Sequence, residues 1–122
     1  MKKLVALVLS IILAVNVAVS AAAVSPKAIN RVNTIIPPGG ITKVGTPLSM
    51  ESGETITINC TYSPRNADVD FGLITPNNTF VFVEGKNGDC NHTVELNKTG
   101  SYYFAVRNNT TEPLEVLGYV YY

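Results

Sequence analysis

The sequence predicts an all-β protein: a single antiparallel β-sandwich, jelly-roll-like, with about eight short strands, preceded by a cleaved N-terminal signal helix. Three observations predict this class. Short runs of alternating apolar and polar residues recur through residues 41–122, turn-forming residues separate them, and no window there has the apolar spacing of a helix. Because large side chains lie on both faces of several runs, a single open sheet would leave an apolar face in water.

The first 23 residues have the three parts of a secretory signal peptide. Met1–Lys3 is cationic, residues 4–19 are apolar apart from Ser10 and Asn16, and Ala21–Ala23 offers small residues at a cleavage site. A permanent anchor needs ~20 apolar residues, whereas this stretch runs directly into the cleavage site. We therefore expect cleavage near Ala23, a secreted, extracellular protein, and no permanent membrane anchor after cleavage.

Residues 24–40 are expected to form an extended lead-in segment, because prolines and glycines interrupt them and their periodicity is weak. Four apolar residues leave open that one stretch docks onto the domain: Ile29, Val32, Ile35 and Ile36. The sandwich domain itself is expected to span residues 41–122.

The clearest strand is residues 54–62, where Ile56, Ile58 and Cys60 alternate with threonine and asparagine. This alternation points Cys60 inward. Residues 69–74 and 79–83 are β-branched or aromatic runs that flank a Thr-Pro-Asn-Asn loop, which predicts a hairpin. The other predicted strands are residues 41–44, 47–50, 92–96, 102–108 and 114–122.

Cys60 and Cys90 are the only two cysteines of the chain. In an exported protein such a pair is expected to oxidise to a disulfide, and two ligands are too few for a structural zinc site. Closing a loop of about 31 residues would stabilise the fold by about 3.7 kcal/mol in the chain-entropy account.

The charge and residue inventory excludes several function classes. Without Lys2 and Lys3, the chain has seven Lys and Arg against nine Asp and Glu, and the cations are scattered. This balance argues against nucleic acid and against an anionic membrane surface as partners. The chain has one histidine, His92, and both cysteines are assigned to a disulfide. Few residues are therefore left to act as a nucleophile or a general base. We expect a protein that is not an enzyme.

One acidic constellation has the spacing of an oxygen-ligand site. Asn66, Asp68 and Asp70 alternate between a turn and a strand, which would suit calcium, although the glycine and closing glutamate of an EF-hand are missing. The other interpretation is that these residues cap turns through hydrogen bonds to the backbone. No cofactor is expected, with calcium as the one exception left open.

Tyrosines on the last two predicted strands suggest a ligand-binding surface. Tyr103, Tyr119 and Tyr121 are expected on the opposite side of their strands from the core, whereas Tyr102 should point inward with Phe104. Exposed tyrosines stack on sugar rings or anchor a protein partner. The alternative is that they are ordinary strand residues with high β-propensity. Asn-X-Ser/Thr sequons recur along the chain, for instance at Asn91, Asn97 and Asn108, and we interpret them as compositional.

The C-terminal half contains a Gly-x-Tyr-x-Phe-x-Val-x-Asn strand from Gly100 to Asn108, directly after a turn. The C-terminal half resembles small secreted bacterial β-sandwich proteins and the bacterial pre-peptidase C-terminal domains that are appended to secreted peptidases. In those domains a similar strand follows a turn. The resemblance covers about 50 residues. It implies a sandwich fold with an accessory or binding role and carries no catalytic residue across.

Together these features predict a small secreted, non-enzymatic binding or accessory module for an extracellular polymer, carbohydrate or protein. The competing class is a structural or self-assembling cell-envelope protein whose edge strands pair between copies. A small hydrolase would need two carboxyl groups that converge in a cleft.

Overall fold

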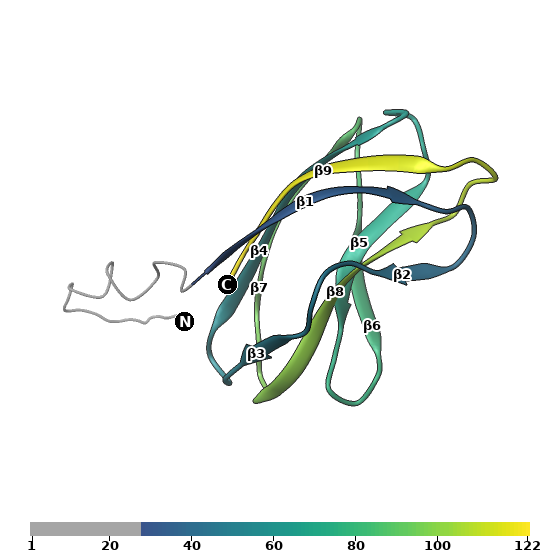
Figure 1. Cartoon of the computed structure of the whole chain (residues 1–122). Coiled ribbons are helices and arrows are strands. Elements are labelled where there is room, and N and C mark those ends of the chain that lie inside the picture. The colour runs from purple at the N-terminus through teal and green to yellow at the C-terminus, as the bar shows by residue number, and fades with distance from the viewer. Residues whose placement is uncertain (1–27) are drawn as a thin grey trace, which may run out of the picture.

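The computed structural model describes residues 28–122, which form two antiparallel β-sheets packed face to face (Figure 1). The first sheet has the strand order β1-β9-β4-β7, and the second has the order β2-β8-β5-β6 with β3 also paired to β8. The predicted all-β, two-sheet class is confirmed, and the predicted signal helix lies outside the described residues. The strands are β1 (Ile29–Ile36), β2 (Ile41–Lys43), β3 (Leu48–Met50), β4 (Thr55–Ser63), β5 (Val69–Ile74), β6 (Phe80–Glu84), β7 (Asp89–Glu95), β8 (Gly100–Asn108) and β9 (Leu114–Tyr121).

The chain crosses repeatedly from one sheet to the other. β1, β4, β7 and β9 belong to the first sheet, and the strands between them belong to the second. This alternation is the arrangement expected of a jelly roll. Among the strands of residues 28–122, only β5 and β6 are joined as a hairpin within one sheet, at the Thr-Pro-Asn-Asn loop where the sequence predicts a hairpin.

Strand β1 lies inside the segment that we expected to be an extended lead-in. It pairs along its whole length with β9, and its residues Val32 and Ile36 are buried in the core. The sheet therefore begins ahead of residue 41, because these apolar residues have strand spacing and can be buried. Figure 1 shows β1 and β9 side by side, with the C-terminus next to the start of β1. Ala28 and Tyr122 exchange two backbone hydrogen bonds there, of 2.6 and 2.9 Å.

Alternation along each strand fills the space between the sheets with apolar side chains. On β4 the buried positions are Ile56, Ile58, Cys60 and Tyr62, as the sequence predicts. On β8 both Tyr102 and Phe104 point inward, and the Tyr102 hydroxyl donates a hydrogen bond of 2.6 Å to the Lys98 carbonyl. Among residues 28–122 no helix is long and apolar enough to cross a membrane.

One fully buried polar residue, Asn108, holds the end of the sandwich together. Its Nδ2 donates to the carbonyls of Ile36 at 3.2 Å and Glu112 at 2.8 Å, and its Oδ1 accepts from the Thr110 N–H at 2.9 Å. Satisfying the amide in this way removes the penalty of burying it. Because this side chain is enclosed and bonded, the sequon at Asn108 is not available to a glycan in the folded protein.

Candidate functional site

Two of the three tyrosines expected on the surface lie together on the outer face of the first sheet. Tyr119 and Tyr121 alternate with buried Val120 on β9, and their ring centroids are 6.2 Å apart with an interplanar angle of 33°. Tyr119 is 44% exposed. Two outward aromatic rings two residues apart on one strand form a continuous apolar platform.

Strand pairing brings polar side chains to both sides of this platform. Arg31 on β1 is the register partner of Tyr119, and Asn59 on β4 faces Tyr119 from the other side. Both side chains are exposed. The row Arg31–Tyr119–Asn59 therefore crosses three strands and joins residues that are far apart in the sequence.

These residues line a groove of about 420 Å³ on the outer side of the sheet. Its shape depends on Gly118, where a Cβ atom would lie 2.2 Å from the Asn59 carbonyl oxygen and 2.6 Å from the Cys60 Cα, and where φ is +146°. Only glycine permits β9 to lie this close to β4. The full lining is Arg31, Val32, Asn59, Thr61, Leu117, Gly118, Tyr119 and Tyr121.

The side chains of the groove are of the kinds that bind a ligand. Its lining supplies two aromatic rings and the five N–H donors of one guanidinium. The Asn59 amide and the hydroxyls of Thr61, Tyr119 and Tyr121 both donate and accept. None of the eight lining residues is acidic, so the one charge there is positive.

The third predicted tyrosine, Tyr103, is not part of this groove. It lies on β8 in the second sheet, and the Lys43 ammonium is 4.2 Å from the centroid of its ring. The expectation that Tyr103 faces away from the core is met, but it is on a different sheet from Tyr119 and Tyr121. Arg31 and Asn59 were missing from the predicted site, because their place beside Tyr119 depends on strand register rather than on a local motif.

Of the proposed calcium ligands Asn66, Asp68 and Asp70, the two aspartates accept hydrogen bonds from neighbouring side chains. Asp70 is buried and accepts hydrogen bonds from Arg107 Nε at 2.8 Å and Asn109 Nδ2 at 2.9 Å, and it forms an ion pair of 2.7 Å with Arg107 Nη2. Asp68 accepts a longer bond of 3.2 Å from Asn109. Asn66 is exposed. In the described part of the chain no three His, Cys, Asp or Glu side chains are grouped as metal ligands. Calcium stays the open alternative to the prediction of no cofactor.

Cys60 and Cys90 are register partners on β4 and β7, and both are buried free cysteines in this structure. The expected disulfide therefore stays a prediction. Burial, followed by the neighbouring Cys90, raises the pKa of the Cys60 thiol to about 12, and burial followed by Asp89 raises the pKa of Cys90 to about 11. Both are neutral thiols at pH 7, which makes them weak nucleophiles.

The remaining titratable candidate, His92, lies exposed on β7, the edge strand of the first sheet. Its register partner is Ile58 on β4. Within residues 28–122 no side chain forms a hydrogen bond or ion pair that would orient this imidazole as a general base, in the way that a third group orients the base of a catalytic triad.

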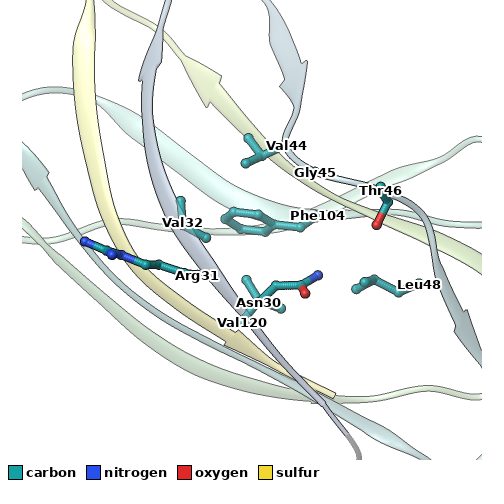
Figure 2. Close-up of a pocket in the computed structure, with 9 residues that line it drawn as sticks. All are labelled: Asn30, Arg31, Val32, Val44, Gly45, Thr46, Leu48, Phe104 and Val120. Carbon is teal, nitrogen blue, oxygen red and sulfur yellow. The ribbon is translucent and has the colours of Figure 1, made fainter.

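A second cavity, of about 250 Å³, opens at the edge of the sandwich between the two sheets (Figure 2). Strand β1 contributes Asn30 and Val32 to one wall, and the β2–β3 connection contributes Val44 and Thr46 to the other. Phe104 lies between them. The cavity is mainly apolar, and its core lining residues Val32, Leu48, Phe104 and Val120 each expose 4% or less of their surface.

Comparison with known proteins identifies the type of fold. The sequence matches no protein-family profile and no curated protein. Its structure is similar to PliG of Aeromonas hydrophila, a periplasmic inhibitor of g-type lysozyme, with a TM-score of 0.53 and 12% identity over 76% of this chain and 84% of that one. A carbohydrate-binding module of Cellvibrio mixtus lichenase 5A, solved with cellotriose, has a TM-score of 0.43 and 17% identity over 80% of this chain and 87% of that one. At this identity the first likeness shows the fold, a β-sandwich.

Proposed function

We propose that this protein is a secreted, non-enzymatic binding module that holds a glycan strand in the groove beside Tyr119 and Tyr121. The observation that carries the proposal is the row of Arg31, Tyr119 and Asn59 across β1, β9 and β4. An aromatic platform with hydrogen-bonding groups on both sides suits a sugar, because a pyranose has an apolar C–H face and a rim of hydroxyls.

The charge of the groove narrows the class of glycan. Arg31 is the one charged residue in the lining, and a guanidinium binds a carboxylate through two parallel hydrogen bonds. Neutral glycans and glycans with carboxylate groups therefore fit, while a polycationic polymer does not. The lack of any acidic residue in the groove supports a binding role, since glycoside hydrolysis uses a pair of carboxyl groups.

The resemblance to pre-peptidase C-terminal domains implies an accessory role, which agrees with a module that binds without catalysis.

A protein partner is the competing possibility, and the lysozyme-inhibitor neighbour suggests g-type lysozyme as the probe for it. Export through the N-terminal leader is part of the same proposal, because an extracellular glycan is reached only by an exported protein.

Co-sedimentation tests the proposal. The purified protein is mixed with insoluble peptidoglycan, chitin or cellulose, and the bound fraction is measured for the wild type and for the double variant Tyr119→Ala/Tyr121→Ala. We expect binding to at least one polymer that the double variant loses and that Tyr103→Ala retains. Equal binding by the double variant, or binding to lysozyme but to no polymer, would reject the glycan assignment.

A further inference from the structure

In the described part of the chain, strand β1 is an edge strand of the first sheet. The backbone of Ala28 bonds that of Tyr122 in both directions, so in the β1–β9 ladder the even-numbered residues of β1 bond β9. The odd-numbered residues therefore direct their N–H and C=O groups away from the sheet: Ile29, Arg31, Asn33 and Ile35. Within residues 28–122 no strand pairs with that side of β1.

This edge lacks most of the usual protection against pairing, and its one charged side chain is that of Arg31. Natural edge strands are short, or contain proline, lysine or a bulge. β1 has eight residues in unbroken register with β9, with neither proline nor lysine among them. By contrast, β2 and β3 have three residues each, and β7 begins and ends with an acidic residue.

The order of polar and apolar residues in β1 is symmetric about Val32. Reading outward from Val32, both directions give two polar residues and then an isoleucine, Ile29 on one side and Ile35 on the other. If a second β1 pairs antiparallel about Val32, Ile29 of each copy faces Ile35 of the other, and Arg31 faces Asn33. Each outward position then has a partner of the same kind, because the isoleucines oppose isoleucines and the polar residues oppose polar residues.

The inward face of the strand matches in the same register. Val32 of one copy lies opposite Val32 of the second copy, and Asn30 lies opposite Thr34, whose side chains can hydrogen-bond. The four odd-numbered residues of each strand exchange backbone bonds, which gives about eight hydrogen bonds across the pair.

Other registers of two paired β1 strands are less favourable. Centring the pair on Arg31 places two guanidinium groups opposite each other, which is destabilising. Centring it on Asn33 places Ile29 opposite Pro37, which has no N–H to donate. A shift by one residue would align outward backbone groups with residues already bonded to β9 and would interchange the two faces.

The cavity in Figure 2 lies at the same edge. Val32 forms part of its wall, together with the core residues Leu48 and Phe104. A second copy paired at β1 brings its own Val32 beside this cavity, so that apolar side chains of the two copies lie next to each other.

We infer that this protein forms a two-fold homodimer through β1, in which two four-stranded sheets join into one eight-stranded sheet. The two-fold axis is perpendicular to the sheet, so the outer faces of both copies lie on the same side. As a consequence that rests on the proposed function, the two tyrosine grooves share one surface and can hold a single polymer strand with an avidity gain.

The test is sedimentation velocity over a wide range of protein concentration. Charged variants at positions 29 and 35 test the proposed register. Ile29 and Ile35 are 57% and 59% exposed, and neither lines the groove, so substitution there should preserve the fold, which a circular dichroism melt checks. Ile29→Lys/Ile35→Lys places lysine opposite lysine and should raise the dimer dissociation constant at least about tenfold. Ile29→Glu/Ile35→Lys places glutamate opposite lysine and should retain the dimer.

Val81→Lys on the other apolar edge strand, β6, is the matched control and should leave the dimer intact, since Val81 is also exposed. A wild type that is monomeric at every concentration, or a dimer that only Val81→Lys disrupts, would overturn the inference. Glycan binding is measured separately on each variant. A monomer that binds glycan rejects the dimer alone, and a dimer without glycan binding rejects the proposed function alone.

Discussion

Arg31 on β1 lies directly opposite Tyr119 on β9, so a guanidinium from the beginning of the described chain and a phenol ring from its end share one surface. Asn59 on β4 completes the row. The pairing of three strands, rather than any local motif, creates the groove that we propose as the binding site.

Each tyrosine of the groove should contribute measurably to binding. Removing one stacking ring costs about 1 kcal/mol, which is about a fivefold loss of affinity. We therefore expect Tyr119→Ala and Tyr121→Ala each to weaken glycan binding about fivefold in isothermal titration calorimetry with a soluble oligosaccharide of the bound polymer. Tyr103→Ala is the control, because its ring lies on the other sheet beside Lys43. Equal losses at all three positions would indicate a general effect on the fold instead.

Oxidation should join Cys60 to Cys90, because the two residues face each other across β4 and β7. We expect the intact mass to rise by about two protons' mass on reduction, and the oxidised protein to be more stable by about 3.7 kcal/mol in urea unfolding. Cys60→Ala/Cys90→Ala should unfold at the same urea concentration with and without reductant. Free thiols in the protein recovered after export would contradict the predicted disulfide.

The reduced protein should lose stability at alkaline pH. The folded-state pKa values of Cys60 and Cys90, about 12 and 11, exceed the ordinary thiol value of 9.0, so the folded state retains protons that the unfolded chain releases. Their contribution is fully present below pH 9 and falls as pH rises toward 11, by up to about 1.4 kcal/mol per pH unit for each thiol.

Urea unfolding in reductant at pH 8 and pH 10 measures this loss. The Cys60→Ala/Cys90→Ala variant provides the baseline, since other groups also titrate in this range. A reduced wild type whose pH dependence equals that of the variant would show that the two thiols are not desolvated in the folded protein.

The buried Asp70 depends on Arg107 for its charge balance. The two form an ion pair of 2.7 Å, and the Arg107 guanidinium also lies 4.3 Å from the Phe82 ring centroid. Arg107→Met should destabilise the protein by about 2 kcal/mol, because it leaves a buried carboxylate with Asn109 as its remaining side-chain donor.

Thermal unfolding checks the size of this effect against Asp70→Asn/Arg107→Met, which should recover part of the loss. Calcium at Asp70 would have to displace Arg107, so we expect millimolar calcium to leave the melting temperature of the wild type unchanged. A rise that Asp70→Asn abolishes would instead support the calcium site.

Alternation alone was sufficient to predict the sheet class, the inward direction of Cys60 and Tyr102, and the outward direction of Tyr119 and Tyr121. These features depend on the two-residue period of a strand, which is local. The paired role of β1 was not predicted, because its isoleucines are as compatible with a docked linker as with a strand.

The composition of the site was not predictable in the same way. Tyr103 and Tyr119 look equivalent in the sequence, yet the chain crosses between sheets before β9 and separates them. Arg31 reaches Tyr119 only through a register that joins residues 88 positions apart. Long-range strand pairing decides which surface residues meet, and a single sequence does not specify it.

The most direct test of the groove is an NMR titration of the ¹⁵N-labelled protein with a soluble oligosaccharide of the polymer that it binds. We predict that the largest amide shifts fall on Arg31, Asn59, Leu117 and Tyr119, on the outer side of β1, β4 and β9. The outer face of the second sheet, around Tyr103 and Phe82, should remain unchanged. Shifts centred on that second face, or none at saturating sugar, would contradict the assignment of this groove as the glycan site.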